Sequence, residues 1–211
     1  MPTPPKTGRP AKRARNSSPR SAPNAIAVLT QDHRDVEHLF STFEGLGPRA
    51  HKRREATVHK IIESLSQHAA VEETVFYPAV RAMVPGADDD ILEALEEHHV
   101  VKWTLSEMSS MQSEDERFAA KVTVLIETVR HHVREEEGEL FPKVRNSLSR
   151  QQLVELGVQL VAAKADAPTR PHPRSPDSPP GNLIANAVVA PLDAASNLVG
   201  AVANKVRSAA S

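Results

Sequence analysis

A short pattern that occurs twice constrains the fold of this chain more than any other feature. In residues 68–78, and again in residues 132–142, a histidine is followed by two glutamates four and five positions later and by a proline at the same offset. Residues i and i+4 lie on one face of an α-helix, so each copy directs an imidazole and a carboxylate to the same place. The repeat therefore predicts two similar helices, each with a pair of metal-binding side chains.

The histidines of the repeat continue the apolar faces of long helices. Apolar residues recur in steps of three and four before each copy, and two further stretches with the same period also contain a histidine on the apolar face. A carboxylate on such a face is costly unless it is paired or bound to a cation. The residues predicted to face inward are the histidines His33, His68, His98 and His132 and the glutamates Glu72 and Glu136.

The same periodicity predicts an all-α fold, with short loops that favour an up-down antiparallel four-helix bundle. Pro78 is expected to bend or interrupt the second helix, because proline lacks the N–H that a helix interior needs. The expected helices cover residues 24–44, 49–84, 88–111, about 113 to 142 or beyond, and a shorter segment, 149–164.

Composition divides the chain into a helical domain with extensions on both sides. Residues 1–23 are rich in proline and basic residues and lack an apolar period, so we expect a disordered basic tail. The domain covers 24–164, a proline-rich linker covers 165–181, and an apolar, alanine-rich amphipathic helix with one proline break is expected within 182–211.

The two extensions suggest partners of different kinds. Residues 8–13 resemble the core of an AT-hook, which would allow contact with nucleic acid, although a basic arm weakly attracted to phosphate is the simpler interpretation. The C-terminal helix carries few basic residues, so docking on the bundle or self-association is favoured over membrane binding.

Cysteine is absent, which excludes disulfides, iron–sulfur clusters and thiolate zinc sites. Histidine, glutamate and aspartate remain as metal ligands.

The chain also shows no apolar leader and no run long enough to span a bilayer, so a cytoplasmic location is expected. Nothing in it resembles a nucleophilic triad, a phosphate-binding glycine loop or a thiol redox pair.

Several assignments depend on which residue faces inward. A single inward histidine is usually a satisfied core residue, but four on four helices favour a metal site. His98 is preferred to His99 and His132 to His131, because they continue the apolar face.

Glu37, four residues after His33, is a candidate ligand, a hydrogen-bond acceptor for the His33 ring or a solvated charge. We expect solvated carboxylates at Glu73, Glu135 and Glu137, with Glu73 also a candidate acceptor, and plain packing for Phe76, Tyr77 and Phe141.

Four imidazoles with two or three carboxylates exceed what one tetrahedral zinc ion needs. They suit two metal ions bridged by a carboxylate. Nitrogen and oxygen donors without thiolate favour iron, followed by manganese or zinc.

These motifs resemble the hemerythrin-like HHE cation-binding domains. The resemblance rests on Asp32-His33 with Glu37, on Glu96-Glu97-His98, and on the two repeats, and it covers about residues 24–148. It implies a bundle that holds two non-haem iron ions, with Glu72 and Glu136 as bridging carboxylates and His33, His68, His98 and His132 as terminal ligands.

Members of this family bind oxygen, sense oxygen or iron, or act on peroxide and nitric oxide. Oxygen carriers have a further histidine at the position of Lys102, and this difference favours peroxide chemistry or iron sensing over reversible oxygen carriage. We expect a di-iron centre that binds or reacts with oxygen or peroxide. The alternatives are an iron or oxygen sensor that signals through its tails, and a structural bundle whose histidines only form hydrogen bonds.

Overall fold

Over residues 23–176, the part of the chain that the computed structural model describes, the protein is helical and contains no strand. The expected all-α class is therefore confirmed. Within the same range, no helix has the length and apolar character needed to cross a bilayer. The predicted basic tail up to residue 22, the end of the linker and the C-terminal helix lie outside the described residues.

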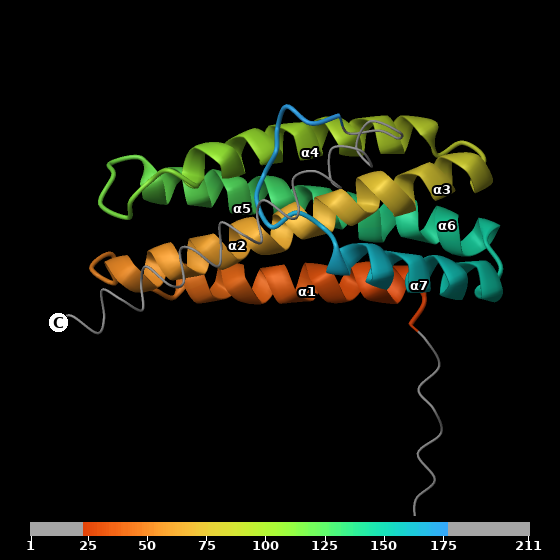
Figure 1. Cartoon of the computed structure of the whole chain (residues 1–211), viewed down its shortest axis with the longest axis horizontal. Coiled ribbons are helices and arrows are strands. Elements are labelled where there is room, and N and C mark those ends of the chain that lie inside the picture. The colour runs from red at the N-terminus through yellow and green to blue at the C-terminus, as the bar shows by residue number, and fades with distance from the viewer. Residues whose placement is uncertain (1–22, 177–211) are drawn as a thin grey trace, which may run out of the picture.

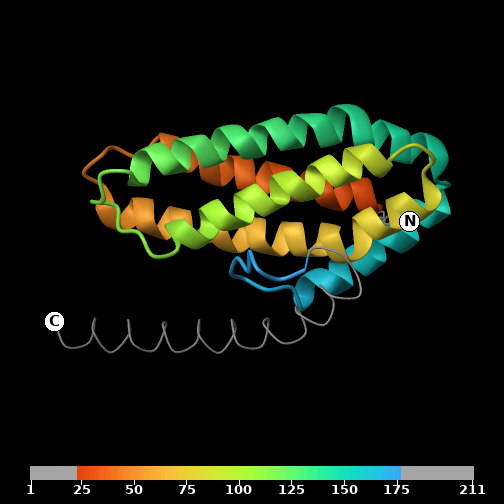
Figure 2. The same cartoon turned by 90° about the horizontal axis from the view of Figure 1, so that it is seen from above.

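The helices lie side by side along one long axis, and α7 packs against one end of α1 (Figures 1 and 2). Two of the predicted helices are each divided by a five-residue π-helical segment, denoted η. In chain order the elements are α1 (Ala25–Glu44), α2 (His51–Val71), η1 (Glu72–Phe76), α3 (Tyr77–Met83), α4 (Asp88–Met108), α5 (Phe118–Glu135), η2 (Glu136–Leu140), α6 (Phe141–Ser147) and α7 (Arg150–Ala165).

Local signals explain where α1 and α7 begin. The side chain of Asn24 accepts a hydrogen bond from the Ala27 N–H and so caps α1. Ser149 and Gln152 form a reciprocal capping box at the start of α7. Both caps satisfy backbone N–H groups that a helix start leaves without an intrahelical partner.

The π-helical segments occupy the same position in both copies of the repeat. Each begins at the first glutamate, and the N–H of the residue that follows the segment bonds to the carbonyl of that glutamate, five residues back. Pro78 and Pro142 then fall at the second position of α3 and α6, directly after the shift of register. Proline has no N–H to donate to a helical hydrogen bond. The expected interruption at Pro78 is therefore a change of helical register that begins at Glu72.

Two separate apolar clusters fill the domain. One contains Leu29, Phe76 and Leu156 and lies towards α3, α6 and α7, and the other contains Phe40 and Leu105 and lies towards the α4–α5 connection. Along each long helical run the inward histidine falls between residues of the two clusters, and the order of the clusters reverses from one run to the next. The histidines of all four runs therefore meet in one polar layer.

Helix α7 docks closely on the start of α1 through Gly157. A Cβ atom at this position would overlap the carbonyl oxygen of Pro23 and lie 2.8 Å from the carbonyl carbon of Asn24. We expect Gly157→Ala to lower the free energy of unfolding by about 2 kcal/mol, because backbone atoms cannot yield as a flexible side chain can. Urea denaturation measures the change. Gly138→Ala is the control, since no atom lies within 4 Å of its Cβ position, and an equal loss in both variants would contradict the prediction.

Candidate metal centre

Two groups of buried metal-binding side chains meet in the polar layer. The first consists of His33, His68, Glu72 and Glu136, and the second of Glu72, His98 and His132. Within each group the ligand atoms all lie within 4.8 Å of one another. Glu72 belongs to both groups, so a single carboxylate connects them.

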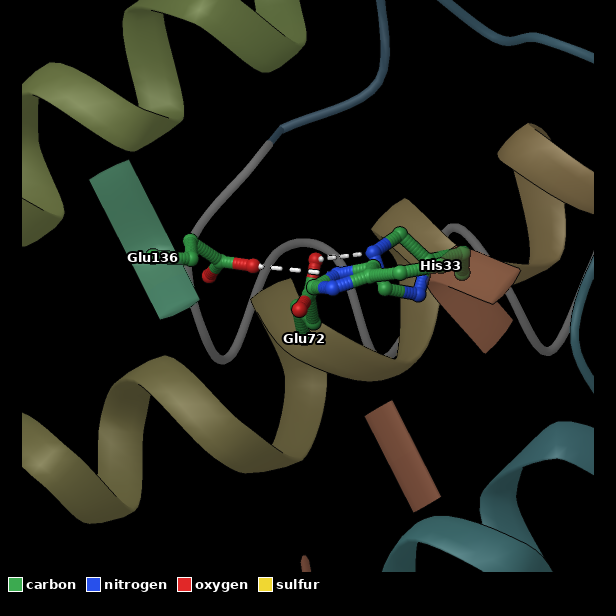
Figure 3. Close-up of side chains that lie close together, drawn as sticks. His33, Glu72 and Glu136 are labelled. Carbon is green, nitrogen blue, oxygen red and sulfur yellow. Dashed lines mark ion pairs between the residues drawn. The ribbon is translucent and has the colours of Figure 1, made fainter. Parts of the chain in front are cut away.

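The imidazole Nε2 atoms point at the two central carboxylates. In the first group, His33 Nε2 lies 3.3 Å from Glu136 Oε2. A dashed line marks this pair in Figure 3. Glu72 Oε2 lies 3.1 Å from His68 Nε2 and 3.4 Å from His98 Nε2. Across the second group, His98 Nε2 and His132 Nε2 are 3.2 Å apart.

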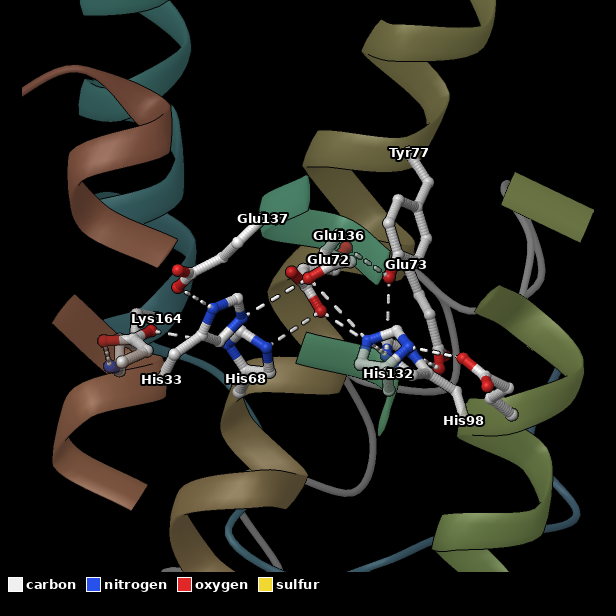
Figure 4. Close-up of polar contacts among 12 residues, drawn as sticks. His33, His68, Glu72, Glu73, Tyr77, His98, His132, Glu136, Glu137 and Lys164 are labelled. Carbon is white, nitrogen blue, oxygen red and sulfur yellow. Dashed lines mark hydrogen bonds and ion pairs between the residues drawn. The ribbon is translucent and has the colours of Figure 1, made fainter. Parts of the chain in front are cut away.

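The opposite nitrogen of each histidine, Nδ1, faces a carboxylate from a neighbouring helical run (Figure 4). These contacts close a ring around the domain, because each run supplies one histidine and one acceptor. The distances are 2.8 Å for His33 to Glu137, 3.7 Å for His68 to Asp32, 3.1 Å for His98 to Glu73 and 2.6 Å for His132 to Glu97.

This arrangement fixes which ring nitrogen can bind a metal. A neutral imidazole whose Nδ1–H donates to a carboxylate has its lone pair on Nε2. Such outer carboxylates also orient metal-binding histidines and raise their basicity. His33, His98 and His132 therefore present Nε2 as the donor atom to the centre. His68 Nδ1, at 3.7 Å from Asp32, is beyond hydrogen-bond distance, although its Nε2 also faces the centre.

Two lysines hold outer carboxylates in place. Lys102 Nζ donates to both carboxylate oxygens of Glu73, at 2.9 and 3.0 Å, and both residues are buried. Lys164, from α7, donates to Asp32 at 2.6 Å. Burial opposes ionisation of both carboxyls. Contacts with His68 and Lys164 nevertheless lower the pKa of Asp32. Contacts with His98 and Lys102 lower the pKa of Glu73 in the same way. Asp32 and Glu73 are thus charged at neutral pH.

The two central glutamates differ in charge. Burial and the neighbouring charge of Glu136 raise the pKa of Glu72 well above its ordinary value. Burial also opposes ionisation of Glu136, but His132 and His33 outweigh it and lower the pKa of Glu136. Burial lowers the pKa of His68 to about 4. Without a metal, these shifts favour the ionised form of Glu136 and the neutral forms of Glu72 and His68.

Several atoms that face the centre have no hydrogen-bond partner among the described residues. They are His33 Nε2, His68 Nε2, both carboxylate oxygens of Glu72, and Glu136 Oε2. Buried polar groups are normally satisfied, and each exception costs about 1–3 kcal/mol. Converging unsatisfied nitrogen and oxygen donors are what a cation would coordinate, so the residues present fit metal ions.

Metal affinity is expected to fall as the pH is lowered. Metal binding must displace any protons on Glu72, His33 and His132. Burial opposes protonation of these two histidines, but contact with Glu136 raises the pKa of each above 6.5. Loss of affinity should therefore begin above pH 6.5. Competition with a chelator and proton release on Zn²⁺ binding measure the effect, and an affinity that is constant between about pH 8 and pH 6 would contradict it.

Residues 24–144 match the family model of the hemerythrin HHE cation binding domain. This chain belongs to that family. An uncharacterised hemerythrin-like protein of Schizosaccharomyces pombe is 26% identical over 167 residues, which cover 79% of this chain and 81% of that protein. A DNA nickase of a Nostoc species is 30% identical over 142 residues, which cover 67% of this chain but only 39% of the nickase.

A solved structure from Mycobacterium kansasii, of a hemerythrin HHE cation binding domain-containing protein, has a similar fold. Its TM-score is 0.58 at 23% identity, over 67% of this chain and 85% of that chain. The family match and the buried donor cluster together identify a cation-binding domain.

In this HHE domain the predicted ligands come together, with one exception. His33, His68, His98, His132, Glu72 and Glu136 line the centre. Glu37 does not reach it, because Arg130 from α5 binds both of its carboxylate oxygens at 2.9 and 2.7 Å. His99 lies outside the centre, where it accepts a hydrogen bond from Trp103, and His131 is exposed.

The outer residues differ most from the expectations. Glu137, expected to be solvated, accepts from His33. Glu73 is buried and bonded to His98, which matches its alternative role as an acceptor. Tyr77 does more than pack, since its hydroxyl donates to Glu136 Oε1 at 2.9 Å. Asp32 and Glu97 were not predicted as acceptors. A signal for them exists, because each immediately precedes an inward histidine of its own helix.

Proposed function

We propose that this chain is a di-iron protein whose centre binds or reacts with oxygen or peroxide. The observation that carries the proposal is the position of Glu72, which belongs to both donor groups and can bridge two ions. The donors are nitrogen and oxygen only, which favours iron over metals that prefer thiolate.

Each donor group would hold one ion. His33, His68 and Glu136 would hold the first, His98 and His132 the second, and Glu72 would join them. Iron, when bound, would supply the electrons and the open coordination positions that oxygen or peroxide chemistry requires. The outer carboxylates keep His33, His98 and His132 in the metal-binding tautomer.

The protein environment supports small-molecule chemistry in three ways. Apolar clusters on both sides of the polar layer limit the access of water. The Tyr77 hydroxyl holds Glu136 Oε1 and also lies 3.4 Å from His98 Nε2. A groove of about 370 Å³ between α1 and α5 reaches His33, with a charged rim and apolar walls formed by Val36, Phe40, Val129 and Val133. Its walls suit a small neutral molecule such as oxygen or peroxide.

Peroxide consumption by the iron-loaded protein tests the proposal. We expect iron-loaded protein to change its visible spectrum on addition of peroxide and to consume more than one equivalent per centre. Metal-free protein and iron-loaded Val36→Trp, which narrows the groove, are the controls, and the variant should react more slowly. A loaded protein that is spectrally inert to both oxygen and peroxide would overturn the proposal.

A second candidate function is iron sensing without turnover. The observation that favours it is the contact chain from His68 through Asp32 to Lys164, which connects the centre to α7 and so to the C-terminal segment. It predicts that iron loading changes the oligomeric size or the protease sensitivity of residues after α7. Identical behaviour of loaded and metal-free protein would exclude it.

A further inference from the structure

A small acidic pocket opens between α4 and the run formed by α5 and η2, whereas the apolar groove lies between α1 and α5. Its volume is about 60 Å³, enough for a partly dehydrated cation because one water needs roughly 10–15 Å³. His132 also lines it. The carboxylates around it are Asp90, Glu93, Glu97, Glu135, Glu136 and Glu139.

The pocket reaches the metal centre. Glu136, which is 3% exposed, lines it and has an oxygen, Oε2, with no hydrogen-bond partner among residues 23–176. His132 lines the same space, and its Nε2 lies 3.7 Å from that oxygen. The inner end of the pocket is therefore formed by two residues of the centre.

A third group of metal-binding side chains lies at the outer end. Glu97, His131 and Glu135 bring ligand atoms within 4.8 Å of one another, and His131 Nε2 lies 3.2 Å from Glu135 Oε1. His131 is exposed, whereas Glu97 and Glu135 also line the pocket. Glu97 is shared with the centre, since it holds His132 Nδ1 at 2.6 Å.

We infer that this pocket is the path by which a divalent cation such as Fe²⁺ enters the centre, with Glu97, His131 and Glu135 as an outer site that takes up the ion first. The inference rests on the metal centre proposed above. Lys143 neutralises Asp90 at the edge of the pocket, which leaves the carboxylates near His131 to attract the cation. Clefts lined by one sign of charge raise the on-rates of oppositely charged ligands by about 10- to 1000-fold.

The experiment compares rates of iron uptake by the full chain. Metal-free protein is mixed anaerobically with Fe²⁺, and a chelator added at successive times measures the iron that has become protected. In His131→Gln/Glu135→Gln we expect uptake about 10-fold slower than in the wild type, with the same final iron content. Raising the ionic strength should reduce this difference, because salt screens exposed charges.

His59→Gln/Glu63→Gln is a matched control. This pair has the same spacing, lies on the exposed side of α2 and is remote in sequence from the pocket, so the control should load at the wild-type rate. Equal rates in the two double variants would overturn the entry path while leaving the centre intact. Wild-type protein that protects no iron at any time would overturn the centre itself.

Discussion

Replacing Glu72 with methionine is expected to abolish metal binding and, at the same time, to stabilise the metal-free protein. Glu72 is fully buried, and neither carboxylate oxygen has a hydrogen-bond partner within the described range. Removing it takes one donor from each group and the only carboxylate common to both. Metal content should fall from two ions per chain to near zero in the variant.

The gain in stability has a separate cause. Methionine is close to glutamate in length and carries no polar group that must be desolvated, so the free energy of unfolding of metal-free protein should rise by about 2 kcal/mol. Urea denaturation in the presence of a chelator measures it. Glu63→Met, at an exposed position of the same helix, is the control and should retain its metal. A Glu72→Met protein that keeps two ions would contradict the bridging role.

Lys102→Met is expected to have the opposite effect on stability. Lys102 and Glu73 form a buried pair, and loss of the lysine leaves a carboxylate in the interior with His98 as a weaker partner. Removing one member of a buried pair costs about 3–5 kcal/mol. We expect a loss of about 3 kcal/mol, measured by urea denaturation, and weaker binding of the second metal because Glu73 orients His98.

Two further variants test whether the loss of stability comes from the buried Lys102–Glu73 pair or from the loss of any lysine. Lys121→Met removes a lysine from an exposed ion pair with Glu107 and should cost much less than Lys102→Met, because solvent screens exposed charges. Lys102→Met/Glu73→Gln should be more stable than Lys102→Met alone, since glutamine leaves no buried charge. If Lys102→Met costs no more than Lys121→Met, the lysine does not support the centre.

Lys102 also changes the interpretation of the third helix. Its position suggested a ligand missing relative to oxygen carriers, but the side chain holds the acceptor of His98. This chain therefore differs from oxygen carriers in the contacts that hold the histidines as much as in the number of metal-binding side chains. Sequence spacing alone could not show this, because the acceptor comes from another helical run.

Helical period predicted the inward histidines because burial repeats every three to four residues within a single helix. The same spacing does not bring Glu37 to the centre. Glu72 and Glu136 each begin a π-helical segment, whereas Glu37 lies within the regular helix α1 and faces Arg130. The ring of outer carboxylates depends on how neighbouring helices are rotated, which the period of one helix does not specify.

Iron content together with X-ray absorption at the iron edge distinguishes a bridged pair of irons from single or separate ions. In protein loaded with Fe²⁺ we expect two irons per chain, with nitrogen and oxygen neighbours and a second iron at roughly 3.5–4 Å, the spacing typical of two-metal sites. One iron per chain, or two irons without an iron–iron signal, would contradict a centre in which Glu72 bridges two ions.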